Sequence, residues 1–192
     1  MVSFYQKQHK FYSLYHLGKT LYEKNGFDEY PMAEYSTFVK AINLLSSKSL
    51  RIIDIGCGNG LLLKHIIQHS DKQITPYGID FLNESISEAK FSVCPDFSSN
   101  FICINAKNYS FTGSYDLVLY DPSILKANDA SMLFRRIKKS GSHYCILYSY
   151  SDVIKNRNIT SVTYLLPTID INNFMYNVES EYISLVMTDL RL

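Results

Sequence analysis

The spacing of hydrophobic and polar positions changes near residue 50. Before it, apolar side chains recur three, four and seven residues apart, as at Phe38, Ile42 and Leu45, which is typical of amphipathic helices. Asn25-Gly26 is a stop signal for a first helix, and Pro31 precedes a second. After residue 50, short apolar runs alternate with longer helical patterns, which predicts a different architecture for the rest of the chain.

This alternation predicts βαβ crossovers and hence a mainly parallel sheet with helices on both faces. The last two apolar runs flank the short polar link Glu179-Ser180-Glu181, which favours an antiparallel hairpin. We therefore predict an α/β fold with a doubly wound, mostly parallel, seven-stranded sheet that ends in this hairpin. The predicted strands are 50–55, 75–79, 101–104, 115–120, 144–148, 174–178 and 182–188, and the predicted helices between them are 61–69, 83–91 and 126–139.

The domain organisation follows from the same pattern. Residues 31–192 are expected to form one domain, and residues 1–30 a helical appendage rich in aromatic side chains. A segment of this kind can close over a site and exclude water. It can equally pack on neighbouring helices or form a contact between two copies, and the sequence leaves both possibilities open.

Composition and charge narrow the class of protein. The 192 residues are 46% hydrophobic and 19% charged, with a formal net charge of +1, which excludes a disordered chain and provides no general positive field for nucleic acid. The basic residues at 135–139 close a predicted helix, where positive charge meets the helix dipole, so we interpret them as a solvated helix end. With four scattered cysteines, no apolar leader and no long apolar run, we expect an unprocessed, soluble, cytoplasmic protein, either a monomer or a homodimer.

One motif carries specific chemistry. Residues 54–60 read Asp-Ile-Gly-Cys-Gly-Asn-Gly at a predicted strand-to-helix turn. Glycines allow positive φ angles and close approach of the backbone to a ligand. The helix that follows directs its N-terminal amides at whatever lies above the loop, so the turn suits a carboxylate or a phosphate.

Spacing separates two ligands for this loop. The dinucleotide motif G-x-G-x-x-G would need a glycine at position 61, where the chain has Leu61, and the glycine falls at position 60 instead. An acidic residue that binds ribose is expected about 20 residues further on, and Asp80 stands there. The spacing therefore disfavours NAD, while Asp80 stands where an acidic residue that binds ribose hydroxyls is expected.

In motif content and order, residues 32–192 resemble class I S-adenosylmethionine-dependent methyltransferases, which have a Rossmann-like fold and begin with the motif (D/E)-x-G-x-G-x-G. The resemblance implies S-adenosyl-L-methionine as cofactor and S-adenosyl-L-homocysteine as product. It implies that the glycine loop holds the methionine part, that Asp80 holds the ribose, and that Phe81 and the pair Asn105-Ala106 lie near adenine. The implied cofactor-binding residues are Asp54, Gly56, Cys57, Gly58, Gly60, Asp80, Phe81, Asn105, Ala106 and Tyr120.

The substrate side is expected after the fourth strand, at Asp121-Pro122-Ser123-Ile124. Amino-group methyltransferases often carry (D/N)-P-P-(Y/F/W) here, where the acidic or amide oxygen accepts a hydrogen bond from the target nitrogen and orients it. Asp121 and Pro122 match this pattern, but Ser123 and Ile124 do not, which disfavours a planar nucleobase. The alternative is that Asp-Pro only turns the chain.

Tyrosines complete the expected site. Tyr150 follows the fifth strand and is a candidate catalytic residue, as a hydrogen-bond partner or a base; alternatively, Tyr148 belongs to the core and Tyr150 to the rim. Tyr15, Tyr30 and Tyr35 are candidate walls of the substrate pocket. His65 and His69 are four residues apart, but no third ligand accompanies them, so we expect no metal and a solvated helix face.

We therefore predict a methyltransferase that acts on a small molecule or a peptide, with nitrogen preferred over oxygen. An RNA methyltransferase is an alternative, although the net charge makes nucleic acid an unexpected partner. A non-catalytic subunit that keeps the fold and binds a partner protein is the other alternative.

Overall fold

The computed structural model describes residues 32–150, 162–166, 174–180 and 183–191, together with residues 6–7, 10, 13, 19–20 and 23. The predicted N-terminal appendage lies almost wholly outside these residues, so its role stays a prediction. Within the described part, no helix is long and apolar enough to cross a membrane.

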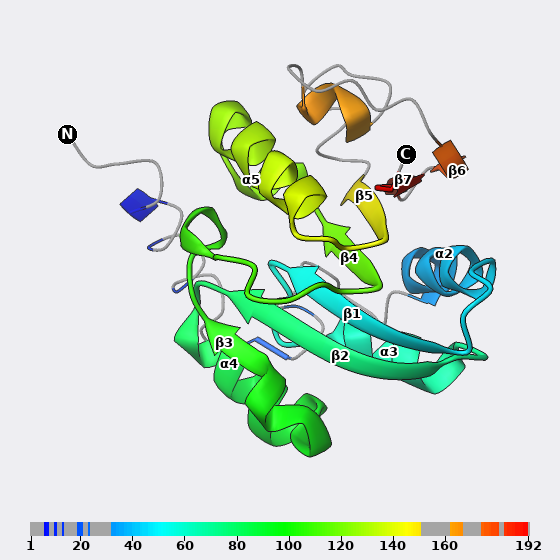
Figure 1. Cartoon of the computed structure of the whole chain (residues 1–192). Helices are drawn as coiled ribbons and strands as arrows, with labels where there is room; N and C mark the ends of the chain where they lie inside the picture. The colour runs from blue at the N-terminus through cyan, green and yellow to red at the C-terminus, as the bar shows by residue number, and fades with distance from the viewer. Residues whose placement is uncertain are drawn as a thin grey trace.

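Seven strands of the described chain form one sheet in the order β3-β2-β1-β4-β5-β7-β6 (Figure 1). The first five strands run parallel, whereas β7 is antiparallel to both β5 and β6. This arrangement confirms the predicted fold class, including the C-terminal hairpin. The strands are β1 Ser49–Ile55, β2 Gln73–Asp80, β3 Phe101–Cys103, β4 Leu117–Tyr120, β5 Tyr144–Tyr150, β6 Phe174–Glu179 and β7 Ile183–Asp189.

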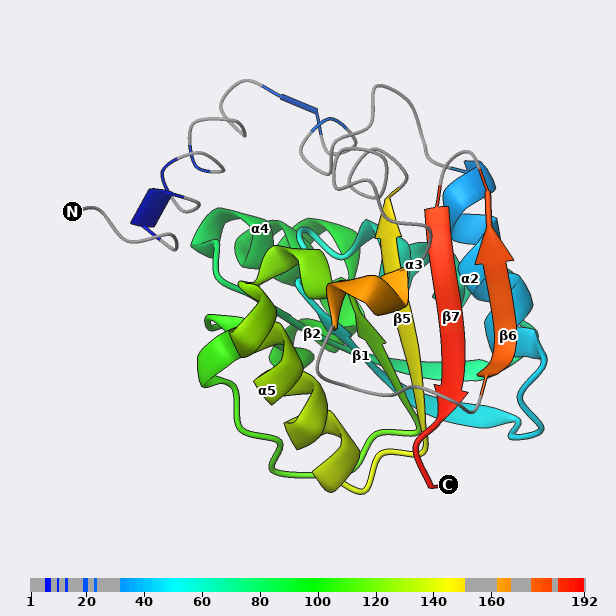
Figure 2. The ribbon, with the colours of Figure 1, turned by 90° about the horizontal axis from the view of Figure 1, so that it is seen from above.

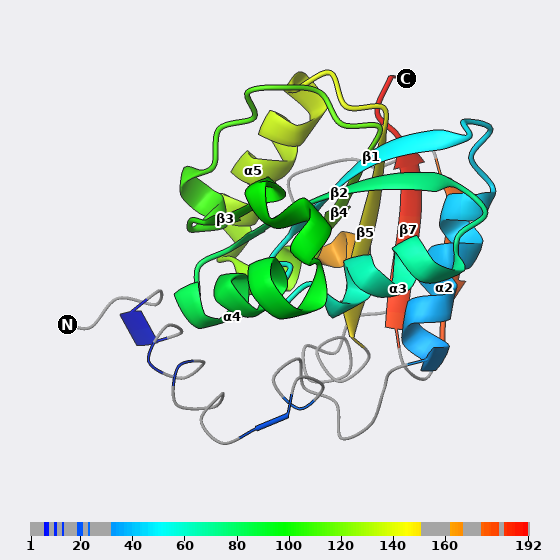
Figure 3. The ribbon, with the colours of Figure 1, turned by 90° about the horizontal axis from the view of Figure 1, so that it is seen from below.

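Helices cover both faces of the sheet. α2 (Met32–Asn43), α3 (Leu61–His69) and α4 (Asn83–Glu88) lie on one face, as Figure 3 shows, and α5 (Ala127–Lys139) lies on the other face, as Figure 2 shows. Each face has its own buried cluster, one centred on α2 and α3 and the other on α5. Short helices fill the connections: the π-helical turn Ala89–Val93 and the 3-10 turns Pro95–Asn100, Ala106–Asn108, Pro122–Ile124 and Val162–Leu165.

The boundaries differ from the predictions where polar residues are involved. β2 extends from Gln73 to Asp80 rather than from 75 to 79, because the parallel pairing with β1 continues past the apolar run to Gln73 at one end, and the strand ends on the polar Asp80. The helix predicted over 83–91 is α-helical only to Glu88 and then widens into the π-helical turn. The strand predicted from 115 begins at Leu117.

The expected solvated helix face was wrong for His65, whereas the expected solvated helix end holds for Arg135, Lys138 and Lys139 and only in part for Arg136. His65 is only 1% exposed, because α2 covers its helix and places Tyr35 with a ring-centroid distance of 5.6 Å. Arg136 does not simply extend into solvent from the basic helix end. Its guanidinium donates hydrogen bonds to the backbone carbonyls of Tyr109 and Lys107, at 2.9 and 2.8 Å, and so ties α5 to the loop after β3.

Candidate active site

Three carboxylates meet at the carboxyl ends of β1, β2 and β4. In the sheet register Asp54 stands opposite Gly78 on β2 and Leu119 on β4. Asp80 and Asp121 each follow these partners by two residues, and because side chains alternate along a strand, all three carboxylates are expected on the same face. Asp54, Asp80 and Asp121 are 1%, 8% and 6% exposed. The fold therefore brings together three carboxylates that the sequence analysis assigned separately to the cofactor and the acceptor.

The glycine loop passes directly above these carboxylates. Gly56, Gly58 and Gly60 have φ angles of 88°, 53° and 81°, a region that disfavours residues with a side chain. The backbone N–H groups of Gly56 and Cys57 donate to the Ile79 carbonyl at 2.8 and 3.0 Å, which ties the loop to the end of β2. Gly60 is the N-cap of α3, so the positive end of that helix dipole points at the loop.

Asp80 organises the loop as well as its own turn. Its Oδ2 accepts the Gly58 N–H at 3.0 Å, and its Oδ1 accepts the Leu82 N–H at 2.9 Å. The Phe81 backbone N–H also hydrogen-bonds this carboxylate. Because a carboxylate has about four acceptor positions, capacity for a ligand hydroxyl remains. The geometry suits a carboxylate that holds a diol while it keeps the loop in place.

Burial raises the pKa of the carboxyl groups of Asp54 and Asp80. Burial raises the pKa of Asp54 to about 7, and the neighbouring charges of Asp80 and Asp121 add to this, while a hydrogen bond from Tyr148 opposes it. Burial also raises the pKa of Asp80, opposed by the backbone N–H groups that it accepts. Negative charge is therefore costly in this site, and a cationic ligand would offset the cost.

Asp121 takes part in a tight turn. Its Oδ1 accepts the Ser123 N–H at 2.8 Å, and the Pro122 carbonyl accepts the Leu125 N–H at 3.3 Å. A second proline at position 123 would have no N–H, so the departure from the family motif gives Asp121 a backbone partner. Ile124 lies under the glycine loop: a Cβ on Gly56 would stand 2.8 Å from the Ile124 Cδ1 atom.

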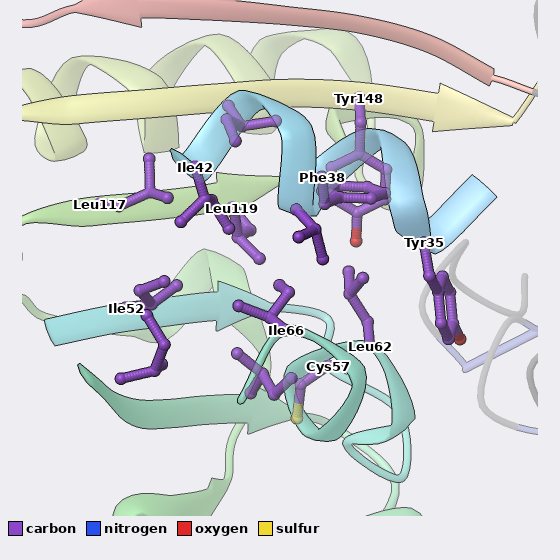
Figure 4. Close-up of a cluster of buried hydrophobic side chains, with 14 of the residues drawn as sticks. Tyr35, Phe38, Ile42, Ile52, Cys57, Leu62, Ile66, Leu117, Leu119 and Tyr148 are labelled. Carbon is purple, nitrogen blue, oxygen red and sulfur yellow. The ribbon is translucent and has the colours of Figure 1, made fainter. Parts of the chain in front are cut away.

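Aromatic residues border the carboxylates on the α2 side. Tyr148 is buried in the core cluster beside Phe38, with ring centroids 4.9 Å apart (Figure 4), and its hydroxyl donates to the Asp54 Oδ1 at 3.5 Å. Tyr150 is half-buried, with its ring 6.1 Å from that of Tyr148. Burial, with the charges of Tyr35, Asp121, Asp54 and Glu34, raises the pKa of Tyr150 well above its usual range. Its phenol therefore stays protonated at neutral pH and suits a hydrogen-bond partner better than a base.

The remaining predicted site residues fall into three groups. Phe81 and Asn105 are half-buried beside the ends of β2 and β3, and the Asn105 side chain accepts the Lys107 N–H at 3.1 Å. Three others are directed into buried clusters: Ala106, Cys57, and Tyr120, whose hydroxyl donates to the Ala130 carbonyl at 3.2 Å. Tyr35 is buried beneath the edge of the site, while Tyr15 and Tyr30 lie outside the described residues.

Two contributions were not found from the sequence. Tyr148 was expected near the substrate or in the core. Its contact with Asp54 carries no local signal, because the two residues are 94 positions apart. Glu34, in the first turn of α2, was not considered, although its charge acts on Tyr150. Among the described residues no three His, Cys, Asp or Glu side chains are grouped so as to hold a metal ion.

Comparison with known proteins gives the family. Residues 46–182 match the family model described as a methyltransferase domain. The comparison with curated proteins found no match. The match covers well over half of the chain, so the chain belongs to the methyltransferase-domain family.

Solved structures show the same fold. The N-methyltransferase NodS from Bradyrhizobium japonicum WM9, with bound S-adenosylhomocysteine, superposes with a TM-score of 0.66 at 15% identity, over 94% of this chain and 97% of that one. Magnesium protoporphyrin IX methyltransferase from Synechocystis PCC 6803 has a TM-score of 0.58 at 15% identity, over 98% and 88% of the two chains. The plantazolicin methyltransferase BpumL has a TM-score of 0.51 at 24% identity, over 74% and 54%. With this family and fold, the protein is a class I S-adenosylmethionine-dependent methyltransferase.

Proposed function

We propose that the enzyme transfers a methyl group from S-adenosylmethionine to a nitrogen of a small molecule or a peptide. The observation that carries this proposal is the convergence of three buried carboxylates, Asp54, Asp80 and Asp121, below a glycine loop with positive φ angles. Two proteins with a similar fold fit an acceptor of this kind: NodS is an N-methyltransferase, and BpumL was solved in complex with a pentazolic desmethylPZN analogue.

The residues present fit the cofactor. We assign the ribose to Asp80, whose carboxylate keeps acceptor capacity beside its three backbone partners. We assign the methionine part to the loop of Gly56, Gly58 and Gly60 and to Asp54. Phe81 and Asn105 are assigned to the adenine: the Asn105 oxygen is used by the Lys107 N–H, so its NH₂ group remains as a donor. When bound, the cofactor supplies a methyl group already activated by a sulfonium.

Asp121 is assigned to the acceptor. Its carboxylate is fixed by the Ser123 N–H at 2.8 Å, so it offers a positioned oxygen to an amine N–H and a negative charge to the positive charge that develops on nitrogen. Tyr150 and Tyr35 lie on the α2 side of this carboxylate, where aromatic rings and Glu34 suit a cation. A phosphate-rich acceptor would meet repulsion from the same charges.

The experiment compares matched acceptors and matched variants. Methyl transfer is measured with radiolabelled S-adenosylmethionine against pairs of amines and the corresponding alcohols, and against RNA. We expect transfer to amines, and a fall in kcat of about 100-fold in Asp121→Ala, with cofactor affinity nearly unchanged. Asp116→Ala, at the opposite edge of the sheet, is the control. An undiminished kcat in Asp121→Ala would remove Asp121 from the mechanism, and transfer to alcohols or RNA alone would overturn the acceptor class.

A further inference from the structure

Tyr148 spans the sheet to reach Asp54. Asp54 on β1 stands opposite Leu119 on β4, which stands opposite Ile146 on β5, and Tyr148 is two residues further along β5. β1 and β5, which lie on either side of β4, are therefore about 10 Å apart. Only a long side chain can cross this distance, and the Tyr148 hydroxyl ends 3.5 Å from the Asp54 Oδ1.

Packing fixes the direction of this side chain. The Tyr148 ring meets the Phe38 ring of α2 edge-on, with centroids 4.9 Å apart and an interplanar angle of 82°, and it meets the Tyr150 ring at the same angle. Tyr148 is 4% exposed, and in Figure 4 its hydroxyl points away from β5 into the space between the strands and α2. The hydroxyl is therefore held in place before any ligand arrives.

The other groups around Asp54 act against its negative charge. They are Asp80 at the end of β2 and Asp121 after β4, besides the burial itself. Cys57 in the glycine loop and Tyr150 on β5 lie near Asp54 as well, but the charge of Asp54 raises the pKa of each, so both stay protonated and neutral. Of the described groups that act on Asp54, the Tyr148 hydroxyl is the one that favours the ionised carboxylate. A donor in this place matters because a cationic ligand needs Asp54 to be negative.

We propose that Tyr148 is a positioning residue whose hydroxyl holds Asp54 across the sheet, oriented and ionised, for the cationic cofactor. The inference rests on the proposed role of Asp54 in cofactor binding, but its first step concerns the protein alone. Tyr148 does not touch the reacting atoms and acts through Asp54. Tyr148→Phe keeps the ring against Phe38 and removes only the hydroxyl.

The first experiment follows the Asp54 carboxyl group by carbon-13 NMR in the cofactor-free protein between pH 5 and 9. The signal is assigned by its loss in Asp54→Asn. In Tyr148→Phe we expect its titration midpoint to rise by about half a pH unit or more, because the hydrogen bond stabilises the ionised form. An unchanged midpoint would overturn the proposal. The control Tyr144→Phe, which removes a hydroxyl at the other end of β5, should leave the midpoint unchanged.

The second experiment measures S-adenosylmethionine affinity over the same pH range. Tyr148→Phe should bind several-fold more weakly at pH 6 and approach the wild-type affinity at pH 9, where Asp54 ionises without help. In an Asp54→Asn background, the substitution should have no pH-dependent effect. A weakening that is equal at every pH would assign Tyr148 a packing role only. If the wild type binds no cofactor at any pH, the proposed function fails, while the NMR titration still decides the role of Tyr148.

Discussion

At the amino-terminal edge of the sheet, charged side chains are exposed and paired, whereas at the carboxyl-terminal edge they are buried beside charges of the same sign. At the first edge, the Arg51 guanidinium lies 5.4 Å from the ring centroids of both Tyr77 and Tyr115. Asp116 accepts the Arg51 backbone N–H at 2.7 Å and stands 3.5 Å from the His143 Nδ1. The charges of Arg51 and Asp116 therefore have partners within the protein.

At the carboxyl-terminal edge, the buried charges are not satisfied in this way. Burial and the charges of Asp80 and Asp121 raise the cost of ionising Asp54, whose pKa reaches about 7. The same sheet therefore has one edge arranged for stability and one edge whose charges are best satisfied by a ligand. The following substitutions test this contrast, from the largest expected effect to the smallest.

Asp80→Ala should weaken binding of S-adenosylmethionine by more than about 100-fold, roughly 3 kcal/mol. The change removes the acceptor of the Gly58 and Leu82 N–H groups as well as the proposed ribose ligand. Asp116→Ala at the opposite edge is the matched control and should bind normally. The measurement is calorimetric titration of both variants, and equal affinities would show that the two edges do not differ in this function.

Asp54→Asn should make the cofactor-free protein more stable above pH 7 and weaken its affinity for the cofactor. The pKa of Asp54 is raised from 3.8 to about 7 on folding, so the stability from this group is present at low pH and is lost as the pH rises through about 7. Such a difference corresponds to as much as about 4 kcal/mol, and we expect about half of it, because an amide is also costly to bury. Urea unfolding at pH 5 and pH 8 gives the comparison. Asp116→Asn should show no such gain, and a gain there would contradict the contrast.

Gly78→Ala should destabilise the protein by about 1–3 kcal/mol. A Cβ at this position would lie 2.6 Å from the Phe101 Cδ1 and 2.7 Å from the Cys57 Sγ, behind the glycine loop. Gly113→Ala is the matched control near the other edge: its nearest neighbour would be the Arg51 Nη2 at 3.9 Å, and it should be neutral or slightly stabilising. Thermal unfolding of the two variants measures the difference in stability. Similar melting temperatures for Gly78→Ala and Gly113→Ala would contradict the prediction.

Arg51→Ala should have the smallest effect, about 0.5–1 kcal/mol of stability, because the cation–π contacts are exposed to solvent. Cofactor affinity should not change. Unfolding in low and high salt measures the effect, and a loss of cofactor binding in this variant would show that the amino-terminal edge also supports the site.

Local chemistry explains what the sequence could predict. Positive φ angles are indicated by the residue type itself at Gly56, Gly58 and Gly60. The spacing from this loop to Asp80 is set by one βαβ unit. The parallel direction of the first five strands follows from the alternation of strand and helix patterns. These features depend on neighbours close in the chain.

The features that sequence analysis missed depend on distant neighbours. His65 is buried because α2 packs over α3. Arg136 donates hydrogen bonds to backbone carbonyls of residues 27 and 29 positions earlier in the chain. Tyr148 can contact Asp54 because the strand order places β5 two strands away from β1, with β4 between them. No periodicity in the sequence indicates a contact between side chains on β5 and β1. The role of Tyr148 beside Asp54 could therefore be found only from the structure.

The most direct test of the account is a calorimetric titration of the folded, cofactor-free full chain with S-adenosylmethionine at pH 6.5, in two buffers of different ionisation enthalpy. The account predicts saturable binding at one site, with release of a proton as Asp54 ionises, and tighter binding at pH 8 than at pH 6. NAD, the control ligand, should not bind. Absence of binding, or binding without proton release and with equal affinity at both pH values, would contradict the claim that these buried carboxylates form the cofactor site.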